Sequence, residues 1–414
     1  MSTAPSDHDL QQQMSGVYGR TFWLAYLANS SLVMANALTF RFAELVHYLG
    51  GSESLVGDIV AIGTLVAVVM RFSVSHFLDD YGTRRIWPIC TLLFIAGCGM
   101  FVMATDMVWM LYAARIAFFV GLTGMFACSM AHIQNHVPND RRTEIIGNLG
   151  SSGFVGMILG SNLGDWILYS IADPRTQFYL LFGGAGLIGV FYLGIVLVLT
   201  HGQDVEKRIA SPMALRLMFR FWPGTVVLAA MTMGLGVTAT QTFLTRYATS
   251  QKIEGIGVFF TGYAISAFVF RLLVQNWSRT IGRHWMLVRG LLGHAVGHLL
   301  LAFVSESWQF ILPSVVCGFG PALLFRAVVS LGSGSCPKVC RGAGTAIILG
   351  FTDFGSLVYA PLLGRIGDQF GFHALYCVSS GIALLTAVGC TFVAHHHPDD
   401  EAQIVSSNNE IPEP

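Results

Sequence analysis

The sequence is poor in charged residues. Asp, Glu, Lys and Arg make up 11% of its 414 residues, whereas a soluble globular domain holds about 25%. The formal net charge is zero, so the excess of basic residues that marks a nucleic-acid-binding domain is missing. Hydrophobic residues account for 54% of the chain, and the mean hydropathy is +0.62. This composition excludes an ordinary soluble domain and predicts a protein that crosses a lipid bilayer many times.

The sequence also lacks the motifs of an enzyme, an ATPase or a metal protein. It holds no Gly-x-x-x-x-Gly-Lys-Ser/Thr loop, the phosphate-binding motif of ATPases. This absence excludes an ATP-driven pump that uses such a loop. The eight cysteines are scattered and lie mostly in apolar runs, which is typical of small packed residues and not of a disulfide framework. His294 and His298 stand four residues apart, but no carboxylate lies near them in that segment. We therefore expect no enzymatic activity, no cofactor and no bound metal.

What the sequence does contain is an internal repeat with a constant offset of 200 residues. The repeated pairs are Gly57 with Gly257, Arg71 with Arg271, Gly82 with Gly282, Gly150 with Gly350 and Gly164 with Gly364. Two copies of a membrane-embedded half that face one another are the usual plan of a secondary transporter, in which the substrate site lies between the halves. The repeat therefore favours a transporter over a membrane enzyme.

Apolar segments long enough to span a bilayer recur along the chain, because about 20 apolar residues suffice for one spanning helix. We expect twelve such helices, at 20–45, 55–78, 86–104, 108–134, 144–170, 177–200, 223–249, 256–278, 285–304, 308–335, 342–367 and 374–395. They predict an all-α membrane protein with an N-terminal six-helix bundle at 20–200 and a C-terminal six-helix bundle at 223–395. A cytoplasmic tail at 1–19, a cytoplasmic linker at 201–222 and a second tail at 396–414 complete the predicted organisation.

The loops between these segments differ in basic residues, which tend to stay on the cytoplasmic side. Loops after even-numbered segments hold twelve Lys and Arg: Arg84, Arg85, Arg141, Arg142, Lys207, Arg208, Arg216, Arg220, Arg279, Arg283, Lys338 and Arg341. Loops after odd-numbered segments hold two, Arg175 and Lys252. This contrast predicts a multi-pass plasma-membrane protein with both termini in the cytoplasm.

The turn after the second segment carries a motif. Residues 75–85 read Ser-His-Phe-Leu-Asp-Asp-Tyr-Gly-Thr-Arg-Arg. This turn resembles the major facilitator superfamily pattern Gly-x-x-x-Asp-Arg/Lys-x-Gly-Arg/Lys-Arg/Lys. The matching residues are Asp79, Gly82 and Arg84, and the departures are Ser75, Asp80 and Thr83. The run 49–57 and the following segment look most similar to bacterial efflux-type members that export sugars and drugs.

The resemblance implies the major facilitator fold of twelve helices in two pseudo-repeated bundles. It also implies that Asp79, Gly82 and Arg84 form a gate, in which Asp79 caps the helix that starts near Gly342. An ordinary turn or N-cap role for Asp79 is the alternative. In the fifth segment Gly156, Gly160, Ser161, Gly164 and Asp165 only partly follow the family's antiporter motif, since its Pro and last Gly are replaced.

Ionisable residues inside the apolar segments are candidates for substrate or proton sites, because burying a charge in lipid costs about 2.5–3.5 kcal/mol on insertion scales. Arg41 and Glu44 share one face of the first segment, and Arg246 has the comparable place in the seventh. Their alternative role is to reach the membrane interface. Arg115, the helix-4 arginine of the family pattern, has a depth that allows a pair with Asp165.

Arg326 and Asp353 lie at a similar depth on consecutive segments, so we expect them to form a buried ion pair. That pair is either structural or part of a substrate or proton site. Arg71 and Arg271 recur in the two halves, and repetition favours a scaffold role for both. Polar residues such as Asn36 and Gln241 add to the candidate lining of the central cavity, which the family resemblance assigns to segments 1, 4, 7 and 10.

The sequence thus predicts a secondary transporter of a small organic solute that works by alternating access, as a proton-coupled exporter. Its expected partners are the solute, protons and the lipid bilayer, and we expect a monomer that binds no nucleic acid. One alternative is a uniporter or symporter of a small carboxylate or other organic anion, with Arg115 or Arg326 as the anion contact. A second, from a different class, is a transporter-like sensor that no longer cycles.

Overall fold

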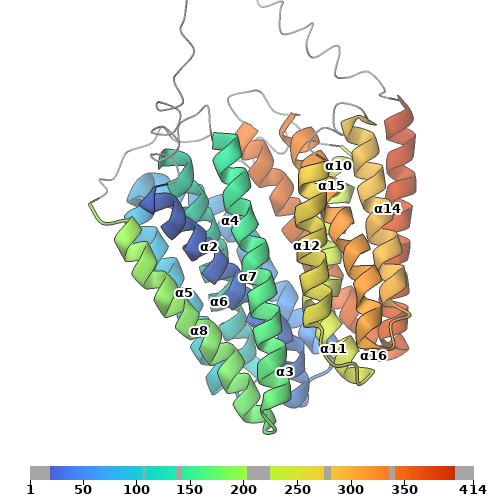
Figure 1. Ribbon diagram of the computed structural model, residues 1–414, viewed down its shortest axis with the longest axis horizontal. Coiled ribbons are helices and arrows are strands. Elements are labelled where there is room, and N and C mark those ends of the chain that lie inside the picture. The colour runs from blue at the N-terminus through green and yellow to red at the C-terminus, as the bar shows by residue number, and fades with distance from the viewer. Residues whose placement is uncertain are drawn as a thin grey trace, which may run out of the picture.

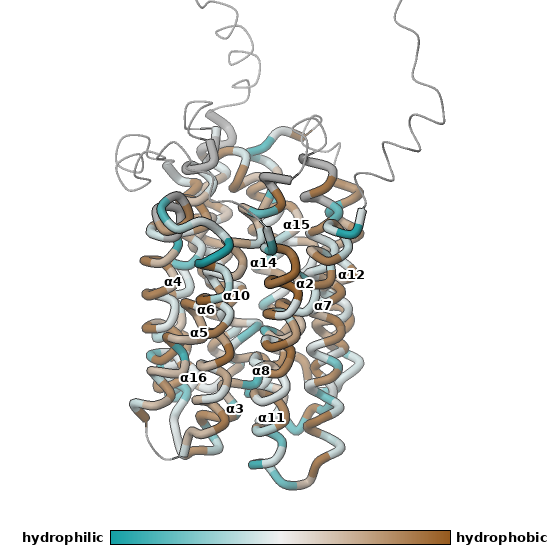
Figure 2. Tube along the Cα trace, turned by 90° about the vertical axis from the view of Figure 1, so that its left-hand side faces the viewer, coloured by the Kyte–Doolittle hydropathy of each residue, from teal (hydrophilic) through white to brown (hydrophobic). Residues whose placement is uncertain are grey.

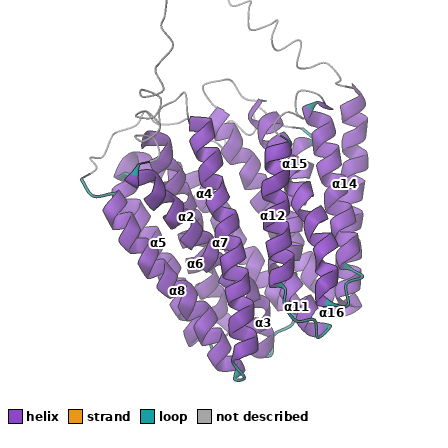
Figure 3. Ribbon diagram, viewed as in Figure 1, coloured by secondary structure: helices purple, strands orange, loops and turns teal. Residues whose placement is uncertain are grey.

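The computed structural model describes residues 19–105, 108–136, 142–202, 224–274, 281–334 and 341–396. Within these ranges the chain consists of helices and the short turns between them, and it holds no β-strand (Figure 3). The predicted linker at 201–222 and the two predicted tails lie almost entirely outside them. The predicted all-α class is confirmed.

The first half of the chain forms one bundle of helices. Its elements are α2 (Arg20–Leu38), the 3₁₀ turn η1 (Thr39–Arg41), α3 (Phe42–Tyr48), α4 (Glu53–Tyr81), α5 (Thr83–Met103), α6 (Val108–His136), α7 (Arg142–Ser170) and α8 (Pro174–Leu199). Within the bundle, α5 packs along α6 and α8, and α2 packs along α7 and α8. The segments expected at the first six positions are all helical.

The second half forms the other bundle. Its elements are α10 (Val226–Thr238), the π-helical turn η2 (Ala239–Phe243), α11 (Leu244–Ser250), α12 (Gly257–Leu273), α14 (Arg283–Leu301), the 3₁₀ turn η3 (Ser307–Phe310), α15 (Ile311–Gly334) and α16 (Arg341–His396). The backbone of α16 turns sharply at Gly371, where φ is 79°, so α16 covers the last two expected segments. Each expected segment of this half is helical over most of its described residues.

Length and composition allow many of these helices to cross a membrane. Among the described residues, seven helices are long and apolar enough to do so, and α12 is a shorter apolar helix. In Figure 2 hydrophobic positions run through the height of the bundle, and hydrophilic ones are commonest near its two ends. Large apolar side chains such as Leu187, Phe303 and Leu385 are exposed on its surface, as lipid contact requires. The count of twelve spans stays a prediction.

The two bundles stand side by side (Figure 1). We call the end at which α2 begins and α16 ends the terminal end, and the opposite end the distal end. Across the interface, α4 of the first bundle packs against α16, and α7 packs against α12. These two helix pairs place any site between the bundles.

The buried apolar core joins the bundles at the distal end. One cluster takes members from both halves, among them Phe42, Phe101, Phe243 and Phe260. A second cluster, from Val226 to Cys390, belongs to the second bundle alone, and a third, of Ala25, Ile133 and Leu149, belongs to the first. These two clusters lie toward the terminal end. In the described parts of the chain, continuous apolar packing therefore connects the bundles distally.

Several glycines of the sequence repeat, among them Gly57, Gly257 and Gly364, lie at the interface between the bundles. A Cβ atom on Gly57 of α4 would meet the carbonyl oxygen of Ala360 in α16. A Cβ atom on Gly364 would meet the carbonyl oxygen of Glu53, and one on Gly257 would lie 2.8 Å from the Asn162 side chain. Only the lack of a side chain lets the backbones approach this closely. These glycines thus mark surfaces by which the halves touch, whereas Gly82 and Gly282 belong to turns.

The helices that begin each half are interrupted at equivalent places. The 3₁₀ turn η1 starts at Thr39, and the π-helical turn η2 starts at Ala239, 200 residues later. The two interruptions pack against one another, and just beyond η2 the hydroxyl of Thr245 in α11 donates to the carbonyl oxygen of Phe40 in η1 over 3.3 Å. Such local changes of helix type are common at functional sites. The turn η1 separates the short distal helix α3 from α2, and η2 separates the short distal helix α11 from α10.

Candidate functional site

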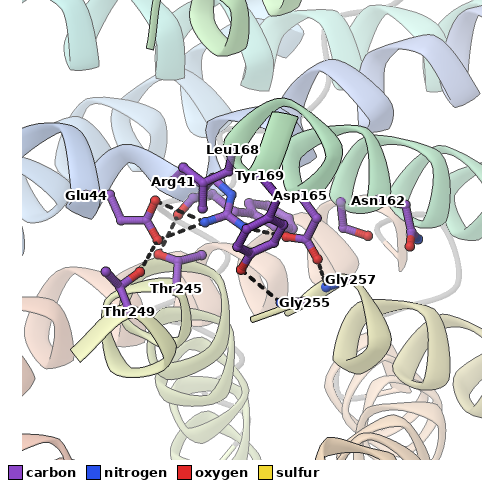
Figure 4. A network of polar contacts seen from close by, with 12 residues as sticks. Arg41, Glu44, Asn162, Asp165, Leu168, Tyr169, Thr245, Thr249, Gly255 and Gly257 are labelled. Atoms are coloured by element: carbon purple, nitrogen blue, oxygen red, sulfur yellow. Dashed lines mark hydrogen bonds and ion pairs between the residues drawn. The ribbon is translucent and has the colours of Figure 1, made fainter. Parts of the chain in front are cut away.

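A buried ion cluster lies at the distal end of the first bundle (Figure 4). The guanidinium of Arg41, at the end of η1, donates through Nη1 to both carboxylate oxygens of Glu44, at 2.9 and 3.0 Å. Its Nη2 donates to Oδ1 of Asp165 in α7. All three residues are less than a tenth exposed. One buried cation thus holds two buried carboxylates.

The same carboxylates reach into the second bundle. Oε1 of Glu44 accepts a hydrogen bond from the hydroxyl of Thr249 in α11, at 2.9 Å. Oδ2 of Asp165 accepts from the backbone N–H of Gly257 at the start of α12, at 2.6 Å. A carboxylate is stabilised at a helix N-terminus because the unpaired N–H groups there carry positive partial charge. Asp165 therefore links Arg41 to a helix of the opposite bundle.

A second ion cluster joins α4 to the second bundle. Nε of Arg246 in α11 donates to Oε1 of Glu53 over 2.8 Å. The carboxylate of Asp368 in α16 accepts hydrogen bonds from the backbone N–H groups of Glu53 and Ser54, at 2.9 and 2.8 Å. These groups belong to the first turn of α4 and have no partner within the helix. An acid of one bundle thus caps a helix of the other.

We call these residues the distal network: Arg41, Glu44, Glu53, Asp165, Arg246, Thr249 and Asp368. The network contains four carboxylates and two guanidinium groups. Oε2 of Glu53 is buried and has no hydrogen-bond partner among the described residues. Asp368 is exposed, whereas Glu44, Glu53 and Asp165 are buried, so carboxylates outnumber guanidinium groups by three to two in the buried part of the network.

The structure confirms the expected contact of Arg41 with Glu44. It also rules out the alternative in which Arg41 and Arg246 reach the membrane interface, because both side chains are enclosed between helices. The expected pair of Arg115 with Asp165 is wrong, since Asp165 bonds Arg41 instead. Arg115 and Asp165 have similar depth in the bundle, but their side chains point to different neighbours. Asp165 faces Arg41, and Arg115 faces aromatic rings.

Arg115 on α6 is surrounded by aromatic rings. Its guanidinium carbon lies 4.3 Å from the ring centre of Phe42, 4.6 Å from that of Phe119 and 5.6 Å from that of Phe118. Nε and Nη1 of Arg115 are buried and have no hydrogen-bond partner in the described ranges. Ring faces attract a cation, but they leave the N–H groups unsatisfied.

Replacing Arg115 by methionine is expected to keep or raise the melting temperature of the purified protein. Methionine fills the space between the rings and removes a buried charge that has no carboxylate partner, and such replacements are often neutral or stabilising. Thermal unfolding followed by tryptophan fluorescence measures the change. A fall of the melting temperature by several degrees would show that the charge itself stabilises the fold.

The expected ion pair of Arg326 with Asp353 is also wrong. Oδ2 of Asp353 accepts from Nε of Arg71 on α4, at 2.6 Å, so this pair joins the two bundles. Nη2 of Arg326 donates to the carbonyl oxygen of Arg271, at 2.8 Å. Equal depth does not fix which way a side chain points, because each residue turns the helix face by about 100°. Asp353 points to α4, whereas Arg326 points to α12.

The predicted gate lies at the terminal end. Gly82 has a φ of 74° in the turn between α4 and α5, and its repeat partner Gly282 has a φ of 82°. Arg84 is exposed beside Gly82. The side chain of Asp79 and its expected partner near Gly342 fall outside the described side chains. The gate role of Asp79 therefore stays a prediction.

Asn36 and Gln241 lie close to the interruptions of their helices. Asn36 precedes η1, and Gln241 belongs to η2. Both are partly buried, and neither side chain is a member of the distal network. Their contact with a substrate stays a prediction.

Sequence reasoning missed two acids of the network, Glu53 and Asp368. Both stand near the ends of apolar segments, where an acid is ordinarily a solvated loop residue. The one local signal is Ser52, which caps α4 and so marks a helix start whose free N–H groups can take a carboxylate. Nothing in the local sequence indicates that the carboxylate comes from 315 residues further along the chain.

The comparisons with known proteins identify the family of the chain. The sequence model of the Major Facilitator Superfamily matches residues 21–270 and 226–412. The multidrug resistance protein MdtG of Serratia proteamaculans is 23% identical over 345 residues, which cover 79% of this chain and 82% of that protein. The multi-drug resistance efflux pump PmrA of Streptococcus pneumoniae is 23% identical over 353 residues, 81% of this chain and 84% of that protein.

A solved structure shares the fold at lower sequence identity. The crystal structure of the nucleoside transporter NupG superposes with a TM-score of 0.72 and is 12% identical in sequence. The match covers 90% of this chain and 98% of that one. With the repeated bundles and the family match over most of the chain, the conclusion follows: this multi-pass membrane protein belongs to the Major Facilitator Superfamily and is a secondary transporter of a small solute.

Proposed function

We propose that the protein is a proton-coupled exporter of a small organic solute in the bacterial inner membrane. In this proposal the terminal end faces the cytoplasm and the distal end faces the periplasm, as the basic loops indicate. Export as the direction is supported by two relatives of similar length, which are named for multidrug resistance and efflux.

The observation that carries the proposal is the excess of carboxylates in the distal network. Its members come from both bundles and are linked across the interface at Glu53 with Arg246, Glu44 with Thr249 and Asp165 with Gly257. These links hold the distal end closed. In an alternating-access cycle, the distal end must part before the solute leaves on that side.

Parting the bundles changes the surroundings of Glu53. In the closed arrangement its carboxylate is paired with Arg246, which favours the ionised form. When the bundles separate, Arg246 moves away, which favours the protonated form, and water enters, which favours the ionised form because burial penalises a charge. Proton binding to Glu53 is thereby linked to the opening and closing of the distal end. This difference between states is what coupling requires.

The proposal is tested by dye transport into and out of liposomes that contain the purified protein. With ethidium as the probe, the wild type should move the dye uphill when a proton gradient is imposed and should stop when the pH is equal on both sides. The change Glu53→Gln keeps a hydrogen-bond acceptor for Arg246 but removes the titrating group. It should retain downhill dye movement and lose the response to the proton gradient.

Asp173→Asn is the matched control. Asp173 caps α8 in a distal turn outside the network, and asparagine caps a helix equally well. Hydrogen bonds from Thr176 hold the pKa of Asp173 below its ordinary value, so this acid does not exchange protons near neutral pH. Uphill ethidium transport that survives in Glu53→Gln would refute the coupling role. If the wild type moves ethidium equally well with and without a proton gradient, proton coupling is refuted.

A further inference from the structure

The repeated arginines Arg71 and Arg271 have unequal surroundings. Each reaches from its own bundle toward the other, Arg71 from α4 to α16 and Arg271 from α12 to α7. Arg71 meets the carboxylate of Asp353. The residue at the position equivalent to Asp353, 200 residues earlier, is Gly153. One of the two arginines therefore has an acid across the interface, and the other has none at the equivalent place.

The guanidinium of Arg271 lies against the backbone of α7. A Cβ atom on Gly150 would lie 2.7 Å from Nη1 and 3.2 Å from Nη2 of Arg271. A second guanidinium stands beside it, because Nη2 of Arg326 on α15 donates to the carbonyl oxygen of Arg271 over 2.8 Å. Both arginines are partly buried. Two positive charges thus share the interface between α7, α12 and α15.

No carboxylate neutralises this pair within the described ranges. Asp353 is committed to Arg71, and Asp165 belongs to the distal network. The only hydrogen bond that either guanidinium makes among the described residues is the one from Arg326 to a backbone carbonyl. A guanidinium presents a planar fork of N–H donors that fits a carboxylate or a phosphate group.

We propose that Arg271 and Arg326 bind the anionic group of a ligand, a carboxylate or a phosphate, between the two bundles. This proposal rests on the proposed transport function and adds the chemical class of a solute. The bound anion pairs with Arg271 as Asp353 pairs with Arg71. It thereby supplies the negative charge that the second half lacks at this interface. Because α7 and α12 belong to different bundles, a ligand held there interacts differently with the two states of the transport cycle.

Sodium benzoate is the probe, and benzamide, which has nearly the same shape without the charge, is its control. Both are added to the purified full-length protein at constant ionic strength while thermal unfolding is recorded. A ligand that binds the folded state raises the melting temperature in proportion to the logarithm of its concentration over Kd. Benzoate should raise it, and benzamide should not. Equal shifts with both compounds would overturn the proposal.

Variants assign the effect to the two arginines. Arg271→Gln and Arg326→Gln should each weaken benzoate binding about tenfold or more, because each removes charged hydrogen bonds. Arg289→Gln, at an exposed position of α14, should bind benzoate like the wild type. Undiminished binding in both Arg271→Gln and Arg326→Gln would overturn the proposal even if these variants differ in stability, since each is compared with its own ligand-free form.

A designed carboxylate gives an independent test. Gly150→Asp places an acid against the guanidinium of Arg271, and Gly150→Asn places an uncharged side chain of the same size there. The Asp variant should melt at a higher temperature than the Asn variant, and this difference should vanish when Arg271 is also changed to Gln. An Asp variant that is no more stable than the Asn variant would show that no anion is accommodated at this position.

The same chemistry is offered by the headgroup of an anionic lipid. Native mass spectrometry of protein from nanodiscs that contain phosphatidylglycerol separates the two sources. Retention of this lipid by the wild type and its loss in Arg271→Gln, without a benzoate shift, would assign the site to lipid. If the wild type shows neither a benzoate-induced rise in melting temperature nor bound phosphatidylglycerol, the proposed anion site is refuted. Proton-driven ethidium transport by the same wild-type preparation shows whether the proposed function stands when the anion site fails.

Discussion

Arg41→Gln is expected to destabilise the protein by about 3–5 kcal/mol, the usual cost of removing one partner of a buried ion cluster. Arg41 is 3% exposed and is the cation between Glu44 and Asp165. Without it, two buried carboxylates face one another with no counter-charge. Since proteins of ordinary stability unfold at a cost of about 5–15 kcal/mol, this change removes a large part of the total.

The effect is measured as the melting temperature of the purified protein and as the amount found in the membrane. Arg365→Gln is the matched control. Arg365 pairs with Asp58 over 3.3 Å, but the two side chains are 55% and 39% exposed, so this pair contributes only about 0–1 kcal/mol. If Arg41→Gln melts at the same temperature as Arg365→Gln, the distal network does not stabilise the fold.

A triple variant separates loss of charge balance from loss of packing. Arg41→Gln combined with Glu44→Gln and Asp165→Asn leaves no unpaired charge among these three residues, and it should recover most of the stability. The triple variant leaves Glu53 and Arg246 unchanged, so it tests the stability of the network without removing the titrating group proposed above. A triple variant as unstable as Arg41→Gln alone would assign the loss to packing.

Gly57→Leu is expected to reduce transport to background while the protein remains folded. The side chain would be directed at the backbone of Ala360 and Pro361 in α16, and backbone atoms give way far less easily than a flexible side chain. The collision lies between the bundles, so the packing within each bundle is preserved. Overpacking of this kind costs about 1–3 kcal/mol, which shifts a two-state equilibrium roughly 5- to 150-fold away from the closed distal end.

A single cysteine at Thr245 reports the shift. Thr245 is fully buried at the contact of η1 with α11, so its thiol should react slowly with a membrane-impermeant maleimide when the distal end is closed. The eight native cysteines are first replaced by serine. Gly57→Leu should increase the labelling of Thr245→Cys severalfold. Gly194→Leu is the control, since a side chain there meets no atom within 4 Å.

Normal transport by Gly57→Leu would show that close approach of α4 and α16 is not needed for the cycle. Loss of transport in both leucine variants would instead point to a general effect of a larger side chain. The prediction therefore requires that only the variant at the interface of the bundles loses transport and gains labelling.

Local features of this protein follow from the sequence because they depend on neighbours along the chain. Apolar runs of about 20 residues specify helices wherever the backbone must satisfy its own hydrogen bonds. The contact of Arg41 with Glu44 needs only their spacing of three residues on one helical stretch. The constant offset of 200 residues indicates two like bundles, and several of its glycines lie where those bundles touch.

The choice of ion-pair partners was decided by the tertiary structure. Depth along a helix can be counted from the sequence, and it placed Arg326 level with Asp353 and Arg115 near the level of Asp165. The direction of each side chain around its helix depends on how the helix is rotated against its neighbours, which only packing fixes. Arg71 therefore holds Asp353, Arg41 holds Asp165, and Arg115 lies among aromatic rings. The helices and their repeat are properties of the sequence, whereas the network that closes the distal end exists only once two bundles have met.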